Sequence, residues 1–334
     1  MEENLQEDLL NLFKKKGGFL NKNLIIKKDL VNGFSIFAIN DILPNEDLIN
    51  VPHNLLIPVD KIKNLNKFNN TFEEIFFKTL SENSNYLNTH PLNCNDLELA
   101  QISRVIKNNE NLYKNFLLKL DKYNLLQEEE KKIELLSATR AIKLKKYNKK
   151  FFMPIMDFVN YNYNGLTYLM GESGNVYIKS EKIIKKDDEI CVNYTPSIQE
   201  AISFYFEHGF IDKSFNSFKI KKNELKLNLN NISTFNKNYF AKNNNVYTFI
   251  QNIDFENNNF SKNFIKLLEI VPSNQRFLMA KKILNMYKNS ISLDTSDNYL
   301  KNSIILKNFY KSVKLYINII ENYLQLITKS YEKN

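Results

Sequence analysis

The chain has 334 residues, of which 43% are hydrophobic, and it carries a formal net charge of +9. This length indicates two domains or one core domain with additions, and the apolar fraction is ample for a buried core. The chain contains no run of about 18 apolar residues, which argues against a membrane span, and its scattered histidines and distant cysteines argue against a zinc cluster. The acidic N-terminus does not resemble a secretory signal and no disulfide is implied, so a reducing cytoplasm is the expected setting.

The N-terminal part of the chain predicts one helix followed by short strands. Apolar residues spaced for one helical face over 5–16 predict an amphipathic helix that ends at the glycine pair 17–18, with lysines in its last turn. The period then changes, and residues 24–60 predict the first half of a small β-rich domain. The expected strands are 24–26, 35–39, 48–51 and 55–57.

Residues 61–150 predict a helical insertion, because apolar residues repeat at helical spacing and no strand signal interrupts them. The last part of this segment, 131–150, holds seven lysines and Arg140 against one acid, Glu134. These charges indicate either the solvated face of an amphipathic helix or a rim that attracts an acidic protein or a nucleic acid. The sequence contains no nucleic-acid-binding motif, so a nucleic-acid partner is not expected.

Strand character returns over residues 151–195. Two strands, 166–170 and 175–179, flank a glycine-containing turn and predict a hairpin. A further short strand, 190–194, delivers Tyr194 to its end, and an aromatic-rich helix then leads to Gly209 and Phe210. From about 218 to the end the pattern predicts helices again, and the apolar stripe of 304–327 is typical of a core-facing helix.

Several short stretches resemble, in their order and rough spacing, the SET-domain methyltransferases, and most nearly the branch typified by Rubisco large-subunit lysine methyltransferase. They are residues 32–38 (NGFSIFA), the segment from Asp41 through Glu46 to Pro52, residues 154–161 (PIMDFVNY), residues 188–194 (DEICVNY) and the pair Gly209–Phe210. The resemblance implies an α+β fold with a β-rich split SET domain, a helical insertion and an all-helical C-terminal domain. The expected boundaries are 1–60 for the N-terminal helix and first SET half, 61–150 for the insertion, 151–217 for the second SET half, and 218–334 for a C-terminal domain of the substrate-binding kind.

The same resemblance implies an S-adenosylmethionine-dependent methyltransferase that acts on a lysine amine of a protein substrate, without a metal. Such a transfer needs a neutral, aligned amine, and a tyrosine hydroxyl at the end of a narrow channel can hold one. By resemblance, Tyr194 is the catalytic tyrosine, and Arg140, Asp157 and His208 lie toward the substrate. The residues that the resemblance places around the cofactor are Asn32, Gly33, Phe34, Arg140, Asn160, Tyr161, Tyr194 and Phe210.

The sequence departs from the family pattern at three positions. Ser35 stands where a second glycine is usual, Tyr161 replaces a histidine, and His208 stands where a channel tyrosine is common. His208 leaves a histidine acceptor open, as in the branch that resembles the actin histidine methyltransferase. The departures together also leave open a catalytically silent SET-like module that binds proteins, and the basic stretch leaves open an adaptor for nucleic acid.

Overall fold

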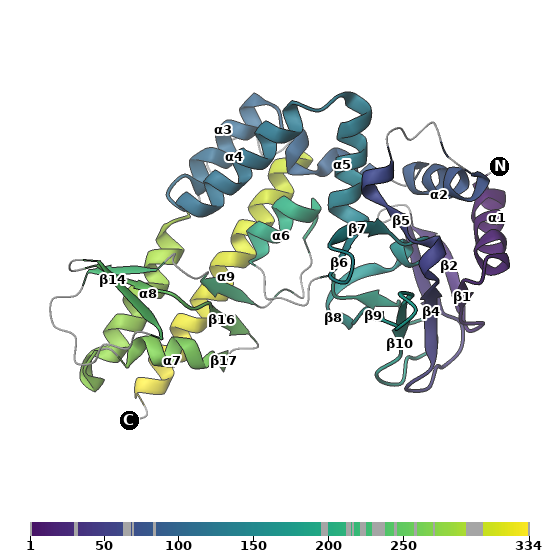
Figure 1. Ribbon diagram of the computed structural model, residues 1–334. Helices are drawn as coiled ribbons and strands as arrows, with labels where there is room; N and C mark the ends of the chain where they lie inside the picture. Colours follow the sequence, from purple (N-terminus) through teal and green to yellow (C-terminus); the bar gives the residue numbers. More distant parts are fainter. Residues whose placement is uncertain are drawn as a thin grey trace. The chain divides into compact units, whose positions relative to one another are not determined.

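The computed structural model describes residues 2–29, 33–62, 68, 70–82, 85–194, 200–211, 215, 217–220, 225–228, 238–243, 246–256, 259–269, 271–291 and 303–332. The chain divides into two compact units, both discontinuous in sequence (Figure 1). The first unit consists of Met1–His90, Asp121–Pro196 and Glu207–Ser214, and the second of Pro91–Leu120, Ser197–Phe206 and Phe215–Asn334.

The first unit is built from small sheets with helices beside them. Its helices are α1 (Glu2–Lys15), α2 (Thr71–Glu82) and α5 (Glu128–Arg140). Its strands are β1 (Phe19–Leu20), β2 (Leu24–Asp29), β3 (Gly33–Ala38), β4 (Asp47–Val51), β5 (Ile57–Pro58), β6 (Ile142–Leu144), β7 (Lys149–Phe152), β8 (Asn160–Leu166), β9 (Leu169–Met170), β10 (Val176–Lys179) and β11 (Cys191–Val192). They pair in the orders β1-β4-β10-β9, β2-β3, β5-β7-β6 and β11-β8.

The N-terminal elements follow directly from local pattern. In α1, Leu9 and Phe13 lie one helical turn apart and both are fully buried. The helix ends at Lys15, and Gly17 in the turn after it has φ of 91°, a conformation that glycine adopts without strain. In the β2–β3 hairpin, Leu24 and Ile26 are buried and Ile25 is exposed, as the alternation of a half-buried strand requires. These elements confirm the predicted helix and strands.

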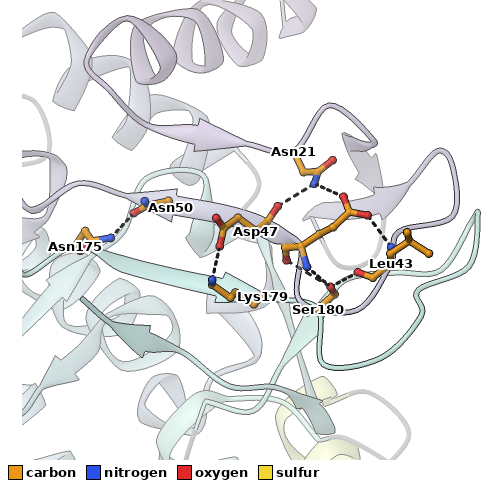
Figure 2. A network of polar contacts seen from close by, with 8 residues as sticks. Asn21, Leu43, Asp47, Asn50, Asn175, Lys179 and Ser180 are labelled. Atoms are coloured by element: carbon orange, nitrogen blue, oxygen red, sulfur yellow. Dashed lines mark hydrogen bonds and ion pairs between the residues drawn. The ribbon is translucent and has the colours of Figure 1, made fainter. Parts of the chain in front are cut away.

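The two halves of the β-rich unit are joined by a polar network beside β4 and β10 (Figure 2). The Ser180 hydroxyl accepts a hydrogen bond from the Glu46 amide at 3.0 Å and donates to the Leu43 carbonyl at 2.5 Å. Asn175 donates to Asn50 at 2.9 Å, so side chains about 125 residues apart are fixed together. Because β4 comes before the inserted helices and β10 after them, this network closes the split sheet.

The second unit contains helices and two small antiparallel sheets. Its helical elements are α3 (Asp96–Ile106), α4 (Glu110–Asn124, whose last residues lie in the first unit), α6 (Ala201–His208, whose last residues also do), α7 (Lys262–Leu268), α8 (Arg276–Asn289) and α9 (Ile304–Glu332). Its strands are β12 (Phe218–Ile220), β13 (Lys226–Asn228), β14 (Phe240–Asn243), β15 (Val246–Phe249), β16 (Ile253–Glu256) and β17 (Asn259–Phe260), paired as β12-β16-β17 and β13-β15-β14. The apolar stripe of α9 is core, as predicted: Phe309, Val313 and Ile320 are fully buried.

Two details differ from the sequence-based expectation. Residues 142–152 form the β6–β7 hairpin instead of continuing the helical insertion, and Asn148, with φ of 51°, lies in its turn. Residues 218–260, expected to be helical, contribute strands β12 to β17, and helices account for the described residues only from 262 onward. Both segments are rich in lysine and asparagine, and their strands are too short for period-two alternation to be recognised. The α+β class and the helical C-terminal end are confirmed, while the domain boundaries stay predictions.

Candidate active site

Three segments that are distant in the sequence, β3, β8 and β11, meet at one place in the first unit. Strand β11 pairs in parallel with β8, with Cys191 opposite Asn160. The residues just before β11 lie against β3, since the Ile190 amide donates to the Ile36 carbonyl at 2.8 Å. Val192 lies opposite Leu166, and the Asn193 amide donates to the Leu166 carbonyl at 2.9 Å, so the chain leaves β11 beside the end of β8. The Tyr194 side chain reaches back to Val159 and Tyr161 at the start of β8.

Gly165 makes this crossing possible. A Cβ on Gly165 would lie 2.7 Å from the carbonyl carbon of Val192 and 2.8 Å from the carbonyl oxygen of Cys191. Real Cβ atoms do not approach backbone atoms this closely, so only glycine permits the observed contact between β8 and β11.

Tyr194 lies at the exit of β11 with its hydroxyl oriented by the backbone. The hydroxyl donates to the Val159 carbonyl at 3.0 Å, and the side chain is half-buried. The rings of other predicted site residues lie near it: the centroid of Tyr161 is 5.3 Å away, that of His208 5.9 Å and that of Phe210 6.5 Å. The predicted catalytic tyrosine therefore lies among aromatic residues that the sequence analysis also assigned to the site.

Asn160, the first residue of β8, has both amide hydrogens engaged. Its Nδ2 atom donates to the Ser35 hydroxyl at 2.7 Å and to Glu189 Oε1 at 2.7 Å. Ser35 is the residue found in place of a second glycine, and it is 1% exposed on β3. The amide of Asn160 is thus held between β3 and the segment just before β11, and its carbonyl oxygen Oδ1 remains as the atom that can accept a hydrogen bond from a ligand.

Arg140 and Asp157 are neighbours in the structure. Arg140 ends α5 and donates from Nη1 to the Asp157 backbone carbonyl at 2.7 Å. The Asp157 side chain is 3% exposed, and its Oδ2 accepts from the Met153 amide at 2.8 Å. Its Oδ1 is buried without a hydrogen-bond partner among the described residues. Burial raises the pKa of Asp157 well above 3.8, and the Met153 amide and the Arg140 charge oppose this only in part.

The turn that presents Asp157 is strained. Ile155 has φ of 69° and ψ of −48° at the start of the 3-10 helix η5 (Met156–Phe158), and a β-branched residue rarely adopts a positive φ. The turn is held by the Asp157 amide, which donates to the Met153 carbonyl at 2.8 Å, and by the return bond from Met153 to the carboxyl. A conformation of this kind costs about 1–3 kcal/mol and is concentrated at functional sites.

Tyr168 lies near the predicted site residues and was not named by the sequence analysis. Burial raises the pKa of Tyr168 well above 10, and Tyr194, Asp157 and Arg140 are close enough to influence it electrostatically. The sequence assigned this tyrosine to a strand, whereas it lies in the short connection between β8 and β9. One tyrosine among 18 gives no local signal of such a role. Only the folding of the connection back toward Asp157 and Tyr194 reveals it.

His208 and Phe210 lie at the end of α6. His208 is 8% exposed, and its Nδ1 atom is 3.1 Å from the Ala138 carbonyl oxygen. A carbonyl only accepts, so Nδ1 carries a hydrogen in this contact. Phe210 is half-buried, with its ring 6.0 Å from that of Tyr161. Together with Tyr194 these residues form a cluster of aromatic rings, which we call the ring cluster (Tyr161, Tyr194, His208 and Phe210).

The described residues include only part of the first predicted cofactor loop, Gly33 and Phe34. Gly33 begins β3 with φ of 81°, a value that favours glycine, and the ring of Phe34 packs on that of Phe158 at 4.8 Å. Asn32 lies outside the described residues. Among those residues no group of three or more His, Cys, Asp or Glu side chains could hold a metal ion, and no helix is long and apolar enough to cross a membrane.

The whole chain is similar to solved SET-domain structures. It aligns with the SET domain of LSMT bound to lysine and AdoHcy over 98% of this chain and 92% of that chain, with a TM-score of 0.60 and 12% sequence identity. Rubisco LSMT bound to sinefungin and monomethyllysine covers the same shares at 12% identity, with a TM-score of 0.55. The SET domain of LSMT bound to MeLysine and AdoHcy gives 0.53 at 12% identity, over 97% of this chain and 91% of that chain. The sequence matches no protein-family model and no curated protein.

The chain therefore has a SET fold. Within that class, its fold is that of Rubisco LSMT, which confirms the predicted resemblance at the level of architecture. At this sequence identity the similarity extends to the fold, so the chemistry has to be argued from the residues of this chain.

Proposed function

We propose that this protein is an S-adenosylmethionine-dependent methyltransferase that transfers methyl groups to a lysine side-chain amine of a protein substrate. The observation that carries the proposal is the meeting of an oriented tyrosine hydroxyl, a buried carboxyl and a second tyrosine at one site. These groups are Tyr194, Asp157 and Tyr168. They lie in a fold whose solved neighbours are bound to lysine or methyl-lysine together with AdoHcy.

The residues present fit the cofactor. When bound, S-adenosylmethionine supplies an activated methyl group carried on a positively charged sulfur. The ring cluster offers aromatic faces, which attract a cation. Because both hydrogens of the Asn160 amide are engaged, its Oδ1 is available to accept from the α-ammonium of the cofactor. Gly33 has no side chain, so a ligand can approach its backbone closely, and the Arg140 guanidinium can meet a carboxylate.

Tyr194 and Asp157 would prepare the acceptor amine. A free lysine has a pKa of about 10.4, so its amine must lose a proton before it can attack. The hydrogen of the Tyr194 hydroxyl is committed to the Val159 carbonyl, which leaves the oxygen to accept a hydrogen bond from the amine and to align its lone pair. A carboxyl with a raised pKa is a stronger base than an ordinary one, so Asp157, once ionised, is a better acceptor for the proton of an ammonium.

The test is transfer of a labelled methyl group by Tyr194→Phe compared with wild type. Loss of the hydroxyl should lower turnover by about tenfold or more and leave S-adenosylhomocysteine affinity nearly unchanged, because the lost contact acts on the amine. The matched control is Tyr177→Phe on β10, whose ring lies beside the Lys179 ammonium at 5.7 Å. Equal turnover in wild type and Tyr194→Phe would remove Tyr194 from the mechanism.

The substrates for this assay are free lysine and the proteins of a cell lysate. Acid hydrolysis of the labelled protein separates methyl-lysine from methylhistidine and so distinguishes the two acceptors. Binding of S-adenosylhomocysteine without transfer to either would favour the silent SET-like module. We further propose that residues 218–334 select the protein substrate, because a single amine gives little specificity by itself.

A further inference from the structure

The contacts of Asn160 raise the question of what fixes its orientation. An asparagine amide can rotate by half a turn and exchange its oxygen and nitrogen at little cost in shape. The two orientations differ greatly for a ligand, because one presents an acceptor and the other presents donors. The partners of the amide therefore decide what it can bind.

Glu189 and Ser35 contribute differently to this choice. A hydroxyl can donate or accept, so Ser35 Oγ is compatible with either orientation of the Asn160 amide. An ionised carboxylate only accepts, and Glu189 Oε1 lies 2.7 Å from Asn160 Nδ2. The reversed amide would bring its oxygen against the carboxylate, with two acceptors in contact. Glu189 thus selects the orientation, and Ser35 holds the second amide hydrogen at 2.7 Å.

We propose that Ser35 and Glu189 are positioning residues that lock the Asn160 amide with its oxygen available to the amino-acid end of the cofactor. The inference rests on the proposed function, since it concerns how the same cofactor is held. Ser35 stands where the family usually has a glycine, and in this proposal its hydroxyl helps to hold the Asn160 amide. The carboxylate also polarises the amide through its hydrogen bond, which strengthens the partial negative charge on Oδ1. A positively charged N–H donor, such as the α-ammonium of the cofactor, forms the strongest hydrogen bond with this oxygen.

The test compares two ligands that differ in the amino-acid end. S-adenosylhomocysteine carries the α-ammonium and carboxylate, whereas 5′-methylthioadenosine keeps the adenosine and thioether and lacks both. The affinities of both ligands are measured by titration calorimetry for wild type, Glu189→Gln and Ser35→Ala. The matched control is Glu181→Gln, which removes another exposed carboxylate.

Glu189→Gln should raise the Kd for S-adenosylhomocysteine by about tenfold, the size expected for a hydrogen bond to a charged group. Ser35→Ala should raise it by about fivefold, because the bond that it removes is neutral. The Kd for 5′-methylthioadenosine should change by less than about threefold, as for a neutral surface substitution. Glu189 is exposed, so its glutamine variant is expected to fold, and a thermal melt of each variant verifies this.

Three outcomes would overturn the inference. Equal losses for both ligands would mean that the residues support the structure and not the amide. Unchanged affinities in both variants, with wild type binding normally, would refute the positioning role and leave the proposed function intact. If wild type bound neither ligand, the proposed function and the inference would fail together.

Discussion

Replacing Asp157 with asparagine tests whether the buried carboxyl is protonated in the folded protein. The side chain is 3% exposed and its Oδ1 has no hydrogen-bond partner among the described residues. Burial raises the pKa of Asp157 well above 3.8. Asparagine has nearly the same shape, keeps an acceptor for the Met153 amide and does not titrate.

The expected effect has a definite sign. In the unfolded chain an aspartate loses its proton near pH ~3.9, whereas folded Asp157 keeps it to a higher pH. Between these two pKa values the folded state binds one more proton than the unfolded state, so the free energy of unfolding falls as pH rises. The slope is about 1.4 kcal/mol per pH unit, and it vanishes above the folded pKa, where both states are ionised. Asp157→Asn lacks this loss and should be the more stable protein at neutral pH.

The measurement is urea unfolding of wild type and Asp157→Asn from about pH 4 to about pH 9. The difference between the two proteins isolates the titration of this carboxyl, because other groups contribute equally to both. Asp121→Asn is the control, since it removes an exposed aspartate on α4. A difference in unfolding free energy that stays constant with pH would refute the reasoning and show that Asp157 is ionised when folded.

Two further predictions concern the stability of the fold. Gly165→Ala should lower the free energy of unfolding by about 1–3 kcal/mol, because the new Cβ would meet the Val192 backbone at 2.7 Å; an unchanged thermal melt would contradict the close approach of β8 and β11. Asn95→Ala should cost about 1 kcal/mol, because the Asn95 side chain accepts from the Glu98 amide at 2.9 Å and caps α3. Asn108→Ala, at an exposed position, is the comparison for the cap, and equal losses in the two variants would argue against it.

The sequence predicted the candidate site only in part. The order of short motifs pointed to Tyr194, Tyr161, His208 and Phe210, and the structure brings their rings together. Their roles stay predictions. Ser35 was noticed only as a departure from a glycine, because the residue that explains it, Asn160, lies 125 positions away.

The sequence alone was sufficient where structure is local. Helices α1 and α9 and the β9–β10 hairpin follow from the spacing of apolar residues and from turn residues, because a helix or a tight turn is determined by near neighbours. Tertiary structure decided the rest. The lysine-rich β6–β7 hairpin and the strands of 218–260 exist through pairing with other strands, and the raised pKa values of Asp157 and Tyr168 come from burial by segments distant in the chain. Burial and hydrogen-bond partners depend on distances between such segments, and a linear pattern does not contain those distances.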